Sequence, residues 1–241
     1  MVTDAAFART ATTKNDTQQN TSAGRAYNDL RERIIEGTLL PGSPLTELDQ
    51  AARLGISRTP VREAIARLIS DGLVTVLGPR TLVVSAIDAR DVVALFELRR
   101  ALDEQAARLA SHRGDQEIFA RIARQFSRVP REISDDDPTR HRYYSLVAVF
   151  DGAVDTAIAG SPYLRSAIAS TRLHLQRVRR LAKDDEERLV AAATEHQAIA
   201  DAIAQRDAER AAHATHLHLH NALTSILHRL PHNGALTQET P

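Results

Sequence analysis

The chain has 241 residues, 43% of them hydrophobic, which suits two modest domains with buried cores. It has no cysteine, so disulfides, thiolate metal sites and thiol catalysis are excluded. Its formal net charge is +0, so any binding to nucleic acid has to come from local groups of basic residues.

The two ends of the chain are polar. The N-terminal stretch has no apolar core like that of a signal peptide, and no apolar run approaches the ~20 residues of a membrane-spanning helix. We therefore expect a cytoplasmic protein with no membrane partner. Residues 1–24 and 231–241 are expected to be flexible tails.

Residues 25–88 are predicted to form three short helices followed by a β-hairpin. The first helix ends at Gly37, the second spans residues 46–54, and the third begins after Ser57. The β-prone runs "LVTVL" and "TLVVS" are separated by "GPR", Gly78 to Arg80, which is typical of a hairpin turn. This order of elements predicts a winged helix-turn-helix domain.

The third predicted helix has an apolar face and a basic beginning. Arg58 and Arg62 are four residues apart and share one face. A helix start with free N–H groups and two guanidinium groups suits phosphates and the O6/N7 edge of guanine. The alternative is a solvated helix start whose arginines pair with Glu63 or Asp71. The surrounding helices and hairpin favour DNA binding. The apolar face consists of Val61, Ala64, Ile65 and Leu68.

This region resembles the DNA-binding domain of the GntR family of bacterial transcription regulators. The stretch "LRERIIEGTLLPGSPLTELDQAARLGISRTPVREAIARLISDGLVTV" carries the resemblance, and its "SRTPVREA" core is highly specific. In the family, residues matching Arg58, Thr59 and Arg62 contact DNA, and a wing glycine matching Gly78 approaches the backbone. At the wing tip, Arg80 can reach a minor groove or a phosphate. The predicted DNA-binding set is Ser57, Arg58, Thr59, Pro60, Arg62, Gly78 and Arg80.

The start of the third helix also has residues suited to a helix N-terminus. Ser57 or Thr59 can cap it with a hydroxyl group, and Pro60 is tolerated in the first turn, where backbone N–H groups lack partners.

Residues 89–230 are predicted to form an all-α antiparallel bundle of about six helices, because apolar residues recur at helical spacing between Gly- and Pro-containing breaks. This part resembles FCD, the helical effector domain of the FadR subfamily. The carrying stretches are Leu95–Ala110, Val149–Leu164 and Glu195–His220. Together the resemblances imply a repressor that binds a palindromic DNA operator as a homodimer and responds to a small organic acid.

Many FCD domains hold a divalent metal with one Asp and three His. The matching positions here are Val147, Asp151, His196 and His218, so the first is no ligand and the second is a carboxylate in place of an imidazole. The resemblance thus implies one Zn or Ni per chain, held by Asp151, His196 and His218. The alternative is a pocket that binds an organic ligand directly, without metal.

Several residues of the bundle have two interpretations. His196 shares a face with core isoleucines, so it is a metal ligand or a satisfied core residue. Helical geometry puts His216 nearer the centre of the last apolar face, but the family register favours His218. Arg99 matches an arginine that grips a ligand carboxylate, and the alternative is an ion pair with Asp103. The predicted effector-binding set is Arg99, Asp151, His196 and His218.

A second class of function is a metal-dependent hydrolase that uses the bundle pocket. No motif places a general base there, and a winged helix would have no role in such an enzyme. We therefore expect a regulator and no enzymatic activity.

Overall fold

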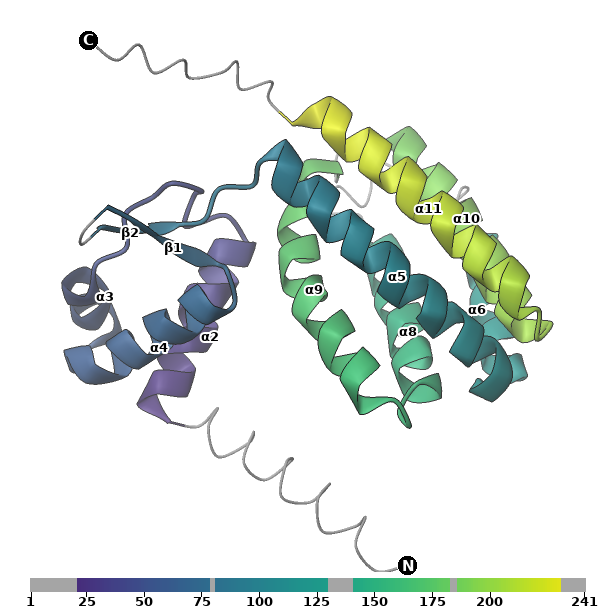
Figure 1. Ribbon diagram of the computed structural model, residues 1–241, viewed down its shortest axis with the longest axis horizontal. Coiled ribbons are helices and arrows are strands. Elements are labelled where there is room, and N and C mark those ends of the chain that lie inside the picture. The colour runs from purple at the N-terminus through teal and green to yellow at the C-terminus, as the bar shows by residue number, and fades with distance from the viewer. Residues whose placement is uncertain (1–20, 79–80, 130–140, 183–185, 231–241) are drawn as a thin grey trace, which may run out of the picture. The chain divides into compact units, whose positions relative to one another are not determined.

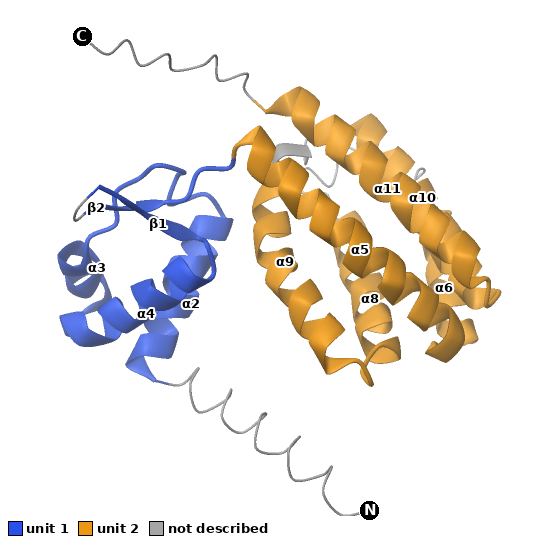
Figure 2. Ribbon diagram, viewed as in Figure 1, with its two compact units in different colours: residues 1–87 blue, residues 88–241 orange. Residues whose placement is uncertain are grey.

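The chain divides into two compact units, residues 1–87 and 88–241 (Figure 2). The first holds a winged helix-turn-helix and the second a helical bundle, so the predicted mainly α fold class is confirmed. None of the helices in the described ranges is long and apolar enough to cross a membrane. The computed structural model describes residues 21–78, 81–129, 141–182 and 186–230.

The first unit contains three helices and a two-stranded sheet in its described part (Figure 1). Helix α2 begins three residues before the predicted start, because the Thr21 hydroxyl accepts a hydrogen bond from the Gly24 N–H at 3.0 Å and so caps the helix. The elements are α2 (Ser22–Ile35), α3 (Glu47–Leu54), α4 (Arg58–Ser70), β1 (Val74–Leu77) and β2 (Thr81–Val84).

Helices α3 and α4 form the helix-turn-helix. Thr46 caps α3 by accepting a hydrogen bond from the Asp49 N–H at 3.1 Å. Gly55 ends α3 in the left-handed conformation, at φ 65° and ψ 32°, which glycine adopts without a Cβ clash. The apolar face of α4 then packs on α2 in a core that includes Leu30, Val61 and Leu68, all fully buried.

The wing is an antiparallel hairpin, as predicted. Val74 pairs with Val84 and Leu77 pairs with Thr81, so the register is continuous along both strands. Gly78 leaves β1 at φ +72°, a conformation that favours glycine at the start of the turn.

The second unit has six helices in its described part, which agrees with the predicted number. Helix α5 packs between α9 and α11, and α10 packs between α6 and α11 (Figure 1). The helices are α5 (Ala89–Arg113), α6 (Gln116–Phe126), α8 (His141–Ala157), α9 (Pro162–Ala182), α10 (Glu186–Ala204) and α11 (Ala208–Arg229).

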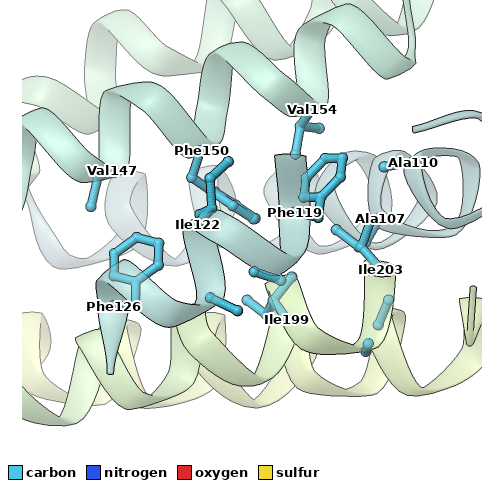
Figure 3. Close-up of a cluster of buried hydrophobic side chains, with 14 of the residues drawn as sticks. Ala107, Ala110, Phe119, Ile122, Phe126, Val147, Phe150, Val154, Ile199 and Ile203 are labelled. Atoms are coloured by element: carbon cyan, nitrogen blue, oxygen red, sulfur yellow. The ribbon is translucent and has the colours of Figure 1, made fainter. Parts of the chain in front are cut away.

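The core of this unit combines aromatic side chains with small ones. Phe119 and Phe126 of α6 meet Phe150 of α8 edge to face, with ring centroids 6.3 and 6.2 Å apart (Figure 3). Alanines on α5, α10 and α11 are fully buried and let these helices approach closely, among them Ala110, Ala200 and Ala211. The result is a rigid frame on which the polar side chains of a cavity are placed.

Candidate functional site

The exposed beginning of α4 is the candidate DNA-binding element. Ser57 occupies the N-cap position, but its side chain makes no capping hydrogen bond, so the expected hydroxyl cap from Ser57 is wrong. Ser57, Arg58 and Thr59 are all exposed, and Pro60 follows in the first turn. The uncapped first turn leaves backbone N–H groups without a side-chain acceptor, as an anion-binding helix start requires.

Arg58 and Arg62 lie on one exposed face of α4, opposite its buried face. Both bind the carboxylate of Glu47, the first residue of α3, at 3.1 Å for Arg58 and 2.8 Å for Arg62. Among the described residues neither arginine pairs with Glu63 or Asp71, the partners considered from the sequence. Asp71 instead accepts a hydrogen bond from the Tyr27 hydroxyl at 2.5 Å.

Of the two wing residues in the predicted DNA-binding set, Gly78 is described by the structure. A Cβ added at Gly78 would meet nothing within 4 Å, so the strand end is open on that side. Arg80, predicted at the wing tip, lies outside the described residues.

The second unit contains a cavity that encloses about 660 Å³ of space, including its part open to solvent. All four predicted effector-binding residues line it: Arg99, Asp151, His196 and His218. They come from α5, α8, α10 and α11, so only the bundle brings them together.

Arg99 forms the ion pair considered from the sequence and also lines the cavity. Its side chain is buried and lines the cavity, and its Nη2 lies 2.9 Å from Oδ2 of Asp103, one turn further along α5. The ion pair therefore orients a buried guanidinium at the cavity wall.

A hydrogen-bonded network around Glu195 fixes the orientation of His218. Glu195 accepts hydrogen bonds from Nδ1 of His218 and Nδ2 of Asn221, each at 2.7 Å, and from both Nη atoms of Arg188 at 3.0 and 2.8 Å. Burial alone would raise the pKa of Glu195, but the hydrogen bonds from His218, Arg188 and Asn221 outweigh it and hold that pKa at about 2. Glu195 is therefore ionised.

His218 itself is neutral near pH 7. Burial lowers its pKa, although the hydrogen bond to Glu195 acts in the opposite direction. Because Nδ1 carries the proton that is donated to Glu195, Nε2 is the nitrogen that keeps a lone pair.

His196 is buried beside His218, with ring centroids 4.4 Å apart. Its ring stacks on Phe126 with a centroid distance of 5.0 Å, and its Nδ1 lies 2.8 Å from the Ala192 carbonyl oxygen. His196 thus points inward, as the sequence predicted, and its ring nitrogen Nδ1 has a partner within the protein. His216, the reserve candidate, points elsewhere: its side chain is 44% exposed and pairs with Glu104 at 2.9 Å.

The predicted metal ligands do not form a metal site. Val147 is buried in the hydrophobic core and offers no donor atom. In the described ranges, no three His, Asp or Glu side chains converge closely enough to hold a metal ion, although Asp151, His196 and His218 line the same cavity. A zinc site ordinarily needs at least three protein ligands, so these residues do not fit one.

The structure also shows residues at the two candidate sites that the sequence did not single out. Arg172 of α9 lines the cavity and pairs with Asp155 at 2.5 Å. Glu195 directly precedes His196 in the sequence, and its contact with His218 lies 23 residues away. Glu47 lies 11 residues before Arg58, and no sequence spacing predicts their contact.

Comparison with known proteins identifies the two units. The family model "Bacterial regulatory proteins, gntR family" matches residues 22–84, and the "FCD domain" model matches residues 94–221. The solved structure of E. coli McbR/YncC has the same fold, with a TM-score of 0.68 at 19% sequence identity over 86% of this chain and 98% of that one.

Two relatives are similar in sequence. An HTH-type transcriptional regulator of Agrobacterium vitis is 42% identical over 89 residues, which is 36% of this chain and about half (52%) of the relative. The "Probable D-xylose utilization operon transcriptional repressor" of Paenarthrobacter nicotinovorans is 30% identical over 221 residues, 90% of this chain and 94% of the relative.

These matches cover both units and agree with the fold that each unit adopts. The hydrolase alternative is therefore set aside. The chain belongs to the GntR family of bacterial regulatory proteins, in the subfamily with a C-terminal FCD domain, and is a DNA-binding transcriptional regulator and not an enzyme.

Proposed function

We propose that this regulator is a cytoplasmic repressor that binds a palindromic operator as a homodimer and responds to a small organic acid. The observation that carries the proposal is the cavity of the second unit, which has the buried guanidinium of Arg99 in its wall. The relative named as a repressor supports the sign of regulation.

The dimer follows from how a helix-turn-helix binds DNA. Each chain presents one recognition helix, α4, and a palindromic site offers two half-sites to two such helices. The DNA-binding residues we propose are those predicted from the sequence: Ser57, Arg58, Thr59, Pro60, Arg62, Gly78 and Arg80.

The effector-binding residues we propose are Arg99, Asp151, His196 and His218. Arg99 supplies charge-assisted donors for a carboxylate, and neutral His218 supplies an acceptor through Nε2 for a hydroxyl group of the same ligand. Some FCD domains bind metal, but the acid binds here without metal, because Val147 has no donor atom and Asp151, His196 and His218 do not converge closely enough to hold an ion.

Regulation requires that the acid binds the DNA-competent and DNA-incompetent states with different affinities. The experiment is to select an operator from a random duplex pool with the full chain. Operator affinity is then measured against a panel of short mono- and dicarboxylates. We expect at least one acid to weaken operator binding. Arg99→Gln should abolish that response and keep operator affinity.

Arg58→Ala is the matched variant in the other unit. It should weaken operator binding by about 1–3 kcal/mol in the presence or absence of the acid. An Arg99→Gln protein that responds like the wild type would contradict the effector site. One tightly bound metal ion per chain in elemental analysis of the natively purified protein would contradict direct recognition of the acid.

A further inference from the structure

One carboxylate lies between the two arginines of the recognition helix. Oε1 of Glu47 accepts a hydrogen bond from Nε of Arg62 at 2.8 Å, and Oε2 accepts from Nη2 of Arg62 at 3.0 Å and from Nη2 of Arg58 at 3.1 Å. Glu47 belongs to α3 and the arginines to α4, so this contact joins the two helices of the helix-turn-helix.

The contact leaves most of the arginine donors available. A guanidinium has five N–H donors, of which Arg62 uses two and Arg58 one in binding Glu47. The side chains of Arg58 and Arg62 are 60% and 66% exposed, whereas that of Glu47 is only 22% exposed. The carboxylate therefore binds the inner edge of Arg62 through Nε and Nη2. The Nη1 donors, which can join in bidentate contact with guanine O6 and N7, stay available.

Glu47 can hold the two arginines in place because its backbone belongs to a packed helix. It is the first residue of α3, directly after the capping residue Thr46, and Ala51 on the same helix is buried in the core of the unit. The hydrogen bond from Arg62 is the main cause that lowers the pKa of Glu47 to about 2, so the carboxylate is ionised wherever the protein binds DNA.

The Glu47 carboxylate also offsets one of the two positive charges at the start of α4. Two arginines and one glutamate leave a net charge of +1 on this face, where the arginines alone would leave +2. Non-specific affinity for DNA depends on the number of phosphates that basic residues neutralise, whereas sequence preference depends on geometry at the base edges.

We propose that Glu47 is a positioning residue for DNA recognition: it holds Arg58 and Arg62 in one geometry and offsets one of their charges. By this means it raises the preference for the operator over other DNA. Glu47 does not itself contact DNA and is absent from the set of DNA-binding residues given above.

The test compares variants of the full chain on two duplexes: the operator selected by the wild type and a shuffled duplex of equal composition. Glu47→Gln should bind the shuffled duplex about fivefold more tightly, because one opposing charge is gone. The slope of log affinity against log salt should become steeper by about 0.9. The ratio of operator to shuffled affinity should fall about tenfold, with the loss concentrated at the base pairs read by α4.

Two matched variants separate geometry from charge. Glu47→Asp keeps the charge but shortens the side chain, so it should lower the affinity ratio and leave the salt slope unchanged. Glu63→Gln removes one charge from an exposed position on α4 that, among the described residues, forms no ion pair with Arg58 or Arg62, so it should strengthen binding to both duplexes equally.

The proposal is overturned if Glu47→Gln behaves like Glu63→Gln, with an unchanged affinity ratio, since Glu47 would then act through charge alone. It is also overturned if Glu47→Asp keeps the wild-type ratio. Circular dichroism establishes that each variant is folded, and Glu47→Asp decides the question if the Gln variant does not fold.

Discussion

At the scale of single residues, Glu195 shows how a buried charge is made stable. Its side chain is 12% exposed and lies among a neutral imidazole, an amide and a guanidinium from α10 and α11. A buried carboxylate without such partners would be protonated or would destabilise the fold. The network thereby holds α11 on α10 and turns His218 toward the cavity.

Glu195→Gln should destabilise the second unit by about 3 kcal/mol. This loss corresponds to the lowering of the Glu195 pKa from 4.5 to about 2, at about 1.36 kcal/mol per pH unit. Urea unfolding monitored by circular dichroism measures it. Glu104→Gln is the control, because Glu104 pairs with the half-exposed His216 and its loss should cost well under 1 kcal/mol.

The same substitution should change the dependence of stability on pH. The contribution of Glu195 is fully present above pH 4.5 and is lost as the pH falls toward 2, because the unfolded state takes up the proton first. Burial lowers the pKa of His218 in the folded state, so the unfolded state takes up a proton more readily as the pH falls. The free energy of unfolding therefore also decreases below pH 6.5, the ordinary pKa of histidine. A Glu195→Gln protein with the wild-type acid unfolding curve would show that the network does not stabilise the carboxylate.

At the scale of elements, helix ends were predictable where one residue type determines them. Gly55 ends α3 because its positive φ suits glycine, and Thr46 begins α3 by capping it. The early start of α2 at Ser22 was missed, because the Thr21 cap lies in a polar stretch without apolar periodicity. Ser57 has the right residue type for a cap and does not make the bond, so the composition of a helix start does not establish its hydrogen bonds.

Gly55→Ala should destabilise the first unit by about 1 kcal/mol, because alanine pays a backbone penalty at φ 65°, while the space around the position is open. Gly152→Ala is the same change inside helix α8, where a Cβ also meets nothing within 4 Å. It should stabilise the second unit by about 0.5–1 kcal/mol. Thermal unfolding of both variants checks the opposite signs; equal signs would contradict the assigned conformation of Gly55.

At the scale of the whole molecule, the two units have separate hydrophobic cores. The core of the first unit includes Leu30 and Val61, and that of the second includes Ile122 and Phe126. Since the described core clusters share no residue, cooperative unfolding is expected within each unit rather than across the chain.

Calorimetry should therefore show two transitions. Leu30→Ala should lower the transition temperature of the first unit only, and Ile122→Ala that of the second unit only. Each substitution should reduce the free energy of unfolding of its own unit by about 2–5 kcal/mol. Both side chains are buried at 1% exposure or less, which makes the substitutions comparable. A single transition that moves with either variant would show that the units unfold together.

The sequence by itself determined the local features of this regulator. The order of helices and hairpin, the arginines at the start of α4, and the inward position of His196 follow from helical periodicity and residue type. These features depend on neighbours within one or two turns, and the family match rests on the same stretches.

Tertiary structure alone decided the partners of those residues. Glu47 meets Arg62 across the helix-turn-helix, and Glu195 meets His218 across two long helices. It also decided that His218 and not His216 faces the cavity, and that Val147 joins the hydrophobic core. Each of these contacts depends on how helices pack and rotate against one another. Packing of that kind is set by the whole core and leaves no periodic signal in the sequence.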